Sequence, residues 1–228
     1  MRKLSILFLL FLSFSQLLAQ DFSKYVNPFI GTAGHGHTSP AAVVPHGMIQ
    51  PGPYTRNHGW DACAGYHFTD TTINGFAQTR LSGTGCADLS DFLLMPMSER
   101  PQLAYEGEKT TNQTCPWASP FQHTTEVAEP GYYRVFLDRY KVLTEISATE
   151  RTAIYRFNYQ DRASSKYLLA DLDYNNQDLY VLAMNWQQVD EHTLQLSRRT
   201  LGWAYNRPVF ATLKTSVPFT LEEMRDTI

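Results

Sequence analysis

The feature that most limits the fold is a series of short runs, rich in β-branched and aromatic residues, in the second half of the chain. Polar turns separate these runs roughly every eight to twelve residues, a spacing typical of sheet sandwiches. No segment shows a sustained apolar period of 3.6 residues, so long amphipathic helices are not expected. We therefore predict an all-β sandwich, with Tyr133, Val135 and Leu137 on one side of a strand. The predicted strands cover residues 131–140, 142–149, 152–159, 166–174, 179–186, 192–199 and 208–217.

The first part of the chain has a different character. From residue 21 to about residue 96 it is rich in glycine, proline and polar clusters, which indicates loops. One continuous apolar piece, Asp91–Met97 (DFLLMPM), predicts a strand within this region.

The first twenty residues predict a secretory signal peptide, 1–20. A short basic start is followed by the apolar run Leu4–Ala19, which ends on a small residue before the polar sequence QDFSK. The run is somewhat short for a membrane-spanning helix, which needs about 20 apolar residues. An uncleaved anchor helix is the alternative. We expect an exported, soluble mature chain, periplasmic or at the cell surface, without a membrane span after cleavage.

Composition excludes one class of partner and suggests another. The formal net charge is -3, and 18% of the residues are charged, so there is no basic surface for nucleic acid. The chain has 13 Tyr, 13 Phe and 4 Trp, and rings of this kind often stack on sugars. The three cysteines, Cys63, Cys86 and Cys115, allow at most one disulfide within the chain.

A histidine-rich loop is the first candidate for chemistry. His35 and His37 flank Gly36 in the stretch GTAGHGHTSP, and in an extended segment their side chains would point to the same face. Two such imidazoles hold zinc or copper if a third ligand converges on them. No rigid helix is visible to carry such ligands, so contact with a polar ligand or a purely structural loop is favoured over a metal site. The candidates for a third ligand are His46, His58, His67 and Asp61.

A second candidate is the tryptophan in the stretch NHGWDAC. Trp60 lies between Gly59 and Asp61, which leaves room for the indole ring at the surface. An exposed ring beside a carboxylate is a plausible sugar platform, because the ring accepts the apolar sugar face and the acid accepts hydroxyls. A core tryptophan with Asp61 capping a turn is the alternative. The stretch 82–91 (SGTGCADLSD) lacks the lysine and the helix of a phosphate loop.

Long stretches of the chain resemble a known family. The segments YVNPFIGTAGHGHTSPAAVVPHGMIQPGP, GWDACAGYHFTDTTINGFAQTRLSGTGCADLSDFLLMP and HTTEVAEPGYYRVFLDRYKVLTEISATERTAIYRFNY are similar to the opening of the exported α-mannosidases of glycoside hydrolase family 92. The similarity runs in order over residues 25–219. His46 departs from it, since phenylalanine is more usual there, and so does the stretch 78–80, where a histidine is expected.

The resemblance implies a two-domain, calcium-dependent enzyme. Residues 21–228 would form its N-terminal domain, an antiparallel β-sandwich of the galactose-mutarotase-like (supersandwich) kind, truncated at its C-terminal end. An α/α barrel would follow and hold the calcium, with the calcium ligands outside this chain. Members of the family are exo-acting α-mannosidases that remove terminal mannose, often from N-glycans, with inversion. Their catalytic carboxyl groups lie in the barrel, so we expect none here: both would come after Ile228.

The rim of the sugar pocket is what the resemblance transfers to this chain. Five residues are expected to bind substrate: Trp60, Asp61, His35, Gly36 and His37. No residue of the chain is expected to bind a metal. The expected partners are mannose-containing glycans and the C-terminal barrel, with no nucleic acid. Two alternatives stay open, a non-catalytic carbohydrate-binding fragment or module and a metal-dependent hydrolase that uses the histidine loop.

Overall fold

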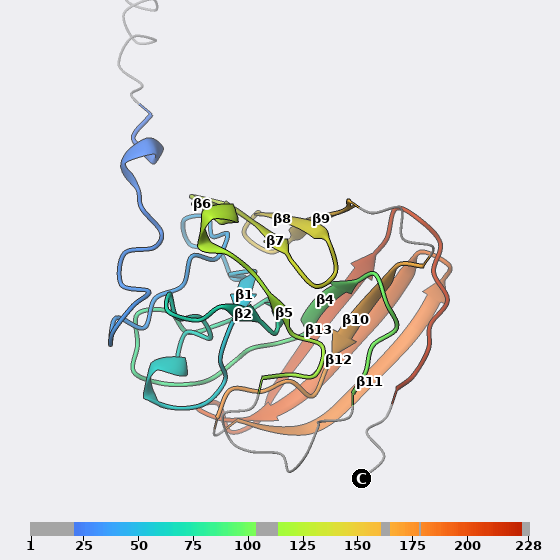
Figure 1. Cartoon of the computed structure of the whole chain (residues 1–228). Helices are drawn as coiled ribbons and strands as arrows, with labels where there is room; N and C mark the ends of the chain where they lie inside the picture. Colours follow the sequence, from blue (N-terminus) through green and yellow to red (C-terminus); the bar gives the residue numbers. More distant parts are fainter. Residues whose placement is uncertain (1–20, 104–113, 161–164, 178, 225–228) are drawn as a thin grey trace, which may run out of the picture.

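A computed structural model of the chain describes residues 21–103, 114–160, 165–177 and 179–224 (Figure 1). Strands and three single-turn 3-10 helices make up the regular structure of these residues. The 3-10 helices are η1 (Ser23–Tyr25), η2 (Trp60–Ala62) and η3 (His123–Thr125). The strands are β1 (Gly52–Tyr54), β2 (Thr72–Ile73), β3 (Gly75–Ala77), β4 (Leu93–Met97), β5 (Ser119–Pro120), β6 (Val127–Glu129), β7 (Tyr132–Leu137), β8 (Val142–Ala148), β9 (Ala153–Tyr159), β10 (Tyr167–Asp171), β11 (Tyr180–Asp190), β12 (Thr193–Leu201) and β13 (Arg207–Lys214).

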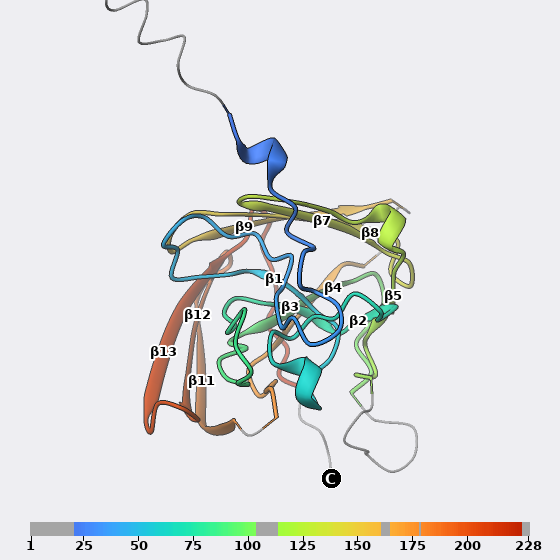
Figure 2. The ribbon, with the colours of Figure 1, turned by 90° about the vertical axis from the view of Figure 1, so that its left-hand side faces the viewer.

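The strands form three main antiparallel sheets and one two-stranded ribbon. The middle sheet has the order β1-β3-β4-β10, and the other two have the orders β6-β7-β8-β9 and β11-β12-β13, while β2 pairs with β5. Figure 2 shows β7, β8 and β9 lying across one side of the middle sheet, with β11, β12 and β13 on another side. This confirms the predicted all-β fold.

The main core lies between the middle sheet and the β6–β9 sheet. Along β7, Tyr133, Val135 and Leu137 are buried and alternate with half-buried residues, as the sequence pattern predicts. They pack with Leu93 and Met95 of β4 in one cluster. Burying each large side chain of this kind stabilises the fold by about 1.5–3 kcal/mol.

A smaller core joins the middle sheet to the β11–β13 sheet. Leu194 and Leu196 of β12 pack there with Phe92 and Leu172, which flank β4 and β10. The chain around β4 thus contributes to two cores, which explains why Phe92–Met97 is continuously apolar instead of alternating.

The longer runs were predicted correctly, and the short strands were not. The predicted strand at 91–97 corresponds to β4, and the seven predicted runs from residue 131 onward correspond to β7–β13. The strands β1, β2 and β3 have only two or three residues each and lie in the region predicted as loops. The equally short strands β5 and β6 lie between β4 and the first predicted run of the second half. Pairing with distant segments creates such strands, so a local pattern does not reveal them. The predicted signal peptide, 1–20, lies outside the described residues. Within the described residues, no helix has the length and apolarity needed to cross a membrane.

The loops of the first part are held by one buried guanidinium. Arg80 is 1% exposed and lies over the ring of Tyr54, 4.6 Å from its centroid. Its N–H groups donate five hydrogen bonds of 2.6–3.2 Å, to the Ser39 hydroxyl and the carbonyl oxygens of Gln50, Gly52, Pro53 and Ala64. Burial lowers the pKa of Arg80. These bonds satisfy carbonyl groups of β1 and of the loops on either side of it.

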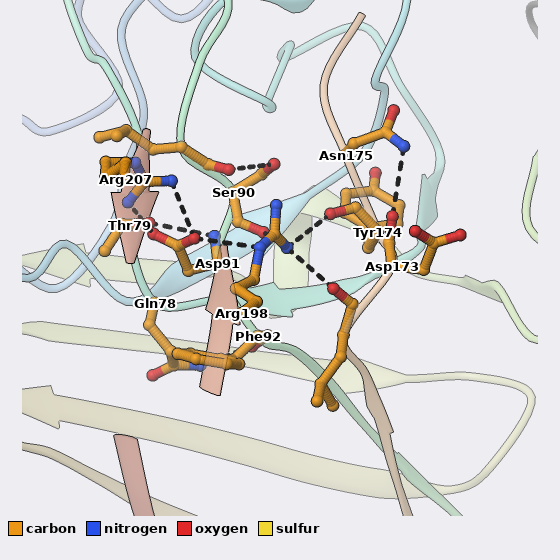
Figure 3. Close-up of polar contacts among 12 residues, drawn as sticks. Gln78, Thr79, Ser90, Asp91, Phe92, Asp173, Tyr174, Asn175, Arg198 and Arg207 are labelled. Carbon is orange, nitrogen blue, oxygen red and sulfur yellow. Dashed lines mark hydrogen bonds and ion pairs between the residues drawn. The ribbon is translucent and has the colours of Figure 1, made fainter. Parts of the chain in front are cut away.

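A second buried polar group fastens β12 and β13 to the middle of the molecule. The two terminal guanidinium nitrogens of Arg207, Nη1 and Nη2, donate hydrogen bonds of 2.8 and 2.9 Å to the carboxylate of Asp91. Nε of the fully buried Arg198 lies 3.3 Å from the same carboxylate. Arg198 also donates from Nη1 to the carbonyl oxygens of Leu172 and Tyr174, at 3.2 and 2.9 Å (Figure 3). Burial lowers the pKa of Arg198, and the Asp91 charge opposes that shift.

Replacing Arg80 by lysine is expected to destabilise the chain by about 2–4 kcal/mol. An ammonium group has three donors and no planar fork, so it leaves buried carbonyl groups unpaired, and each costs about 1–3 kcal/mol. The free energy of unfolding in urea measures the loss. Arg156→Lys is the matched control, since Arg156 is 75% exposed and little change is expected there. Equal unfolding midpoints for the two variants would contradict the assignment.

Asp91→Asn removes the only negative charge in the contacts described for Arg198 and Arg207 and keeps the shape of the side chain. Breaking a buried pair in this way typically costs about 3–5 kcal/mol, because a buried charge is left uncompensated. Glu99→Gln is the control, at the partly exposed pair with Arg139, where a loss below about 1 kcal/mol is expected. Chemical unfolding of both variants gives the comparison. A loss for Asp91→Asn as small as the control's would show that the charge is dispensable.

Candidate functional site

The histidine loop is a tight turn, not an extended segment. The backbone N–H of Thr38 donates to the carbonyl oxygen of Gly31 at 3.3 Å, which closes the loop. A side chain at Gly36 would place its Cβ 2.1 Å from that same oxygen, so only glycine fits between the two histidines. His37 adopts a positive φ of 53°, an uncommon conformation for a residue other than glycine. The expectation of an extended loop was therefore wrong.

Both histidines nevertheless converge, because they meet the carboxylate of Asp61. Nδ1 of His35 lies 2.7 Å from Oδ1 of Asp61, and Nε2 of His37 lies 3.2 Å from the same oxygen. The His35 side chain is 78% exposed, whereas that of His37 is 6% exposed. The hydrogen bond from His35, and then that from His37, lower the pKa of Asp61, while partial burial opposes them. The carboxylate is therefore held ionised between two rings.

Local structure around η2 places the tryptophan beside this cluster. Gly59 precedes η2 with a φ of 89°, and its carbonyl oxygen accepts a 2.6 Å hydrogen bond from the side chain of Gln177. Trp60 is 61% exposed, and its ring meets the His37 ring edge-on at a centroid distance of 4.9 Å. The far edge of the indole lies over Gly85, where an added Cβ would come within 2.7 Å of it. The structure thus places Trp60 at the surface, not in the core.

The indole borders a cleft with a volume of about 480 Å³. Two further exposed aromatic residues line it, Tyr180 at the start of β11 and Trp203 just after β12. Cys63 and Cys86 line it as well and are free thiols. Burial raises the pKa of the Cys63 thiol. The full lining is Trp60, Cys63, Gly85, Cys86, Ala87, Gln177, Tyr180, Leu201, Gly202 and Trp203.

A larger hollow, of about 680 Å³, lies over β7, β8 and β9 but suits a ligand less well. It is the more open of the two, and its one carboxylate is already paired: Arg156 Nε lies 2.5 Å from a carboxylate oxygen of Glu145. We therefore take the cleft beside Trp60 as the candidate site.

Sequence reasoning found one wall of this cleft and missed the other. Tyr180 and Trp203 were not among the predicted site residues, although Trp203 follows Gly202 just as Trp60 follows Gly59. That repeated Gly-Trp pair was the available signal. No side chain fits at position 202, because a Cβ added to Gly202 would lie 2.9 Å from the Asp88 carboxylate. The same carboxylate accepts a 2.9 Å hydrogen bond from the backbone N–H of Trp203.

Among the described residues, one group of histidine, cysteine and acidic side chains is close enough to share a metal ion. It consists of His35, His37 and Asp61, whose ligand atoms all lie within 4.8 Å of one another. Calcium takes six to eight oxygen ligands, and this group offers two nitrogens and one carboxylate. It does not fit the calcium that the family resemblance implies. Of the other proposed third ligands, His67 instead contacts the Thr69 hydroxyl and the Gly34 carbonyl oxygen.

Comparisons with known proteins agree with the fold and with the sequence resemblance. The chain covers 26% of a family GH92 α-mannosidase from Bacteroides thetaiotaomicron, solved in complex with mannoimidazole; 88% of this chain is matched, with 32% identity and a TM-score of 0.81. An inverting GH92 mannosidase from the same organism matches 88% of this chain with 20% identity and a TM-score of 0.56, over 30% of its own length, which shows the fold alone. An uncharacterized secreted glycosidase from Arthroderma benhamiae is 26% identical over 145 residues, which are 61% of this chain and 17% of the relative.

These matches show the fold class and the family. The all-β antiparallel architecture and its likeness to the GH92 structures confirm the predicted fold class. The chain spans only about a quarter of the length of the α-mannosidase solved with mannoimidazole. The sequence model of the Glycosyl hydrolase family 92 N-terminal domain matches residues 25–226, and the chain therefore belongs to glycosyl hydrolase family 92, of which it carries the N-terminal domain.

Proposed function

We propose that this chain is the N-terminal domain of an exported, exo-acting α-mannosidase, and that the cleft beside Trp60 is part of the wall of its sugar pocket. The observation that carries the proposal is the pairing of an exposed indole with an adjacent ionised carboxylate, Asp61, at the edge of an aromatic cleft. The match to an α-mannosidase with a bound mannose-like inhibitor supports the choice of sugar.

The contacts of the cleft fit the two kinds of surface that a pyranose offers. The apolar C–H face of the sugar would stack on the Trp60 ring, with Trp203 and Tyr180 on the other side of the cleft. Asp61 would accept a hydrogen bond from a sugar hydroxyl through Oδ2, because both imidazoles contact Oδ1. His35 and His37 fix the direction of that carboxylate, and Gly36 gives ligand access to bare backbone.

The bond-breaking groups are assigned outside this chain. Inverting hydrolysis needs a carboxylic acid that protonates the leaving oxygen and a carboxylate that activates water, about 6.5–9.5 Å apart. We place both in a C-terminal α/α barrel that follows Ile228, together with the ligands of the calcium ion. Calcium, when bound there, would act as a Lewis acid on sugar hydroxyls. The residues of this chain would bind and orient the sugar.

Export is proposed from the first twenty residues. A basic start, an apolar stretch and the small residue Ala19 form a secretory signal, and a relative is described as a secreted glycosidase. Terminal mannose of N-glycans is the substrate that such an enzyme would meet outside the cytoplasm.

Replacing Trp60 by alanine is expected to weaken binding of methyl α-mannoside to the chain about tenfold, because a stacking contact of about 1.4 kcal/mol is lost. Titration followed by NMR measures the dissociation constant. Phe210→Ala, which removes an exposed aromatic residue of β13 that does not line the cleft, is the control and should bind like the original chain. Equal affinity of all three proteins would remove Trp60 from the proposed site.

Hydrolysis by the protein expressed from the complete reading frame that contains this chain is expected to release β-mannose first from an α-mannoside. Inversion requires this result, and proton NMR at early times distinguishes the two anomers. Release of α-mannose would overturn the inverting mechanism. Sugar binding without any hydrolysis would favour the alternative, a non-catalytic carbohydrate-binding module.

A further inference from the structure

We propose that His35, His37 and Asp61 form a binding site for a divalent transition-metal ion of the zinc type, separate from any calcium site. The inference goes beyond the proposed function and is tested separately from it, because ion binding is measured on the chain without sugar. It revises the expectation that this chain holds no metal ligand.

The distances within the cluster suit a small ion. Zinc–ligand bonds of about 2.0–2.2 Å place tetrahedral ligand atoms about 3.3 Å apart. The two nitrogen–oxygen distances are 2.7 and 3.2 Å, and all three ligand atoms lie within 4.8 Å of one another. An ion that replaces the shared protons therefore needs only small shifts of the exposed His35 ring and the Asp61 carboxylate. Three protein ligands would leave a fourth position open to water.

The types of ligand select the class of metal. Imidazole nitrogen with one carboxylate suits zinc, nickel, cobalt and copper, whereas calcium and magnesium prefer oxygen. The cluster also offers one anionic ligand, because the hydrogen bonds from the histidines lower the pKa of Asp61. A carboxylate beside two imidazole nitrogens attracts a dication.

The scaffold around the ligands replaces the rigid helix whose absence argued against a metal in the sequence. The turn that carries both histidines is packed so closely at Gly36 that no side chain fits there. The Trp60 ring lies edge-on against His37, and the Gly59 carbonyl oxygen is held by Gln177 just before Asp61. Second contacts of this kind orient ligands and typically change metal affinity 10–100-fold when removed. The exposure of His35 gives the ion a path of entry.

Equilibrium dialysis of the chelator-stripped chain against Zn²⁺, with metal analysis by mass spectrometry, tests the proposal. We expect about one Zn²⁺ per chain, undiminished by a large excess of Ca²⁺, and release on acidification, because protons compete with the metal for its ligand atoms. Co²⁺ used as a probe should give the strong ligand-field absorption in the visible region that four-coordinate Co²⁺ shows and six-coordinate Co²⁺ lacks. Stoichiometric binding that Ca²⁺ displaces would overturn the assignment to a transition metal.

Variants of the three ligands distinguish this site from adventitious binding at surface histidines. His35→Ala changes an exposed side chain and leaves the packed turn intact, so it tests the site even if His37→Ala fails to fold. His35→Ala and Asp61→Asn, as single variants, are each expected to weaken Zn²⁺ binding at least about 100-fold. The control His58→Ala, at an exposed histidine outside the cluster, should bind Zn²⁺ like the original chain. Unchanged affinity in His35→Ala and Asp61→Asn, or absence of Zn²⁺ binding by the original chain, would overturn the proposal. Titration of methyl α-mannoside against Trp60→Ala tests the proposed sugar site separately.

Discussion

The candidate site depends on a buried positive charge in a part of the chain that has almost no regular structure. Residues 39–64 are largely loop apart from β1 and η2, yet the carbonyl groups of Gly52, Pro53 and Ala64 all accept hydrogen bonds from one guanidinium, that of Arg80. Unpaired carbonyl groups in a protein interior are costly, so this side chain does for the loops what a neighbouring strand does for a sheet. The turn with His35 and the helix η2 are attached to either end of this region, and their mutual position follows from it.

A second constraint brings the other wall of the cleft into place. Trp203 and Tyr180 belong to the β11–β13 sheet, which has only a small apolar core with the middle sheet. Asp91 adds a directional tie, because its carboxylate meets Arg207 of β13 and approaches Arg198 of β12. Apolar contact is tolerant of sliding, whereas a forked pair fixes orientation. The cleft is therefore shaped by buried polar contacts more than by its own lining.

The sequence indicated the chemistry of the site better than its geometry. Trp60 was expected at the surface because it stands between a glycine and an acid, and the structure places it there. His35 and His37 were expected to share a face for a reason that was wrong, since the loop is a tight turn, and Asp61 was one of four candidates for their partner. Tyr180 and Trp203 were missed. They lie more than one hundred residues away in sequence, and no local pattern indicates which distant ring will face which.

The sequence by itself determined the fold class, the family and the approximate position of every long strand, because β-branched alternation and turn chemistry act over a few neighbouring residues. It also indicated Trp60, Asp61 and the histidine loop as candidate site residues. The tertiary structure alone decided that one carboxylate oxygen is shared by two imidazoles. It also decided that Arg80 binds the carbonyl groups of Gln50, Gly52, Pro53 and Ala64, and that β11 and β12 form an aromatic cleft with the loops around Trp60 and Gly85. Each of these results depends on contacts across large sequence separations, where the free energy of packing selects partners that local preferences leave undetermined.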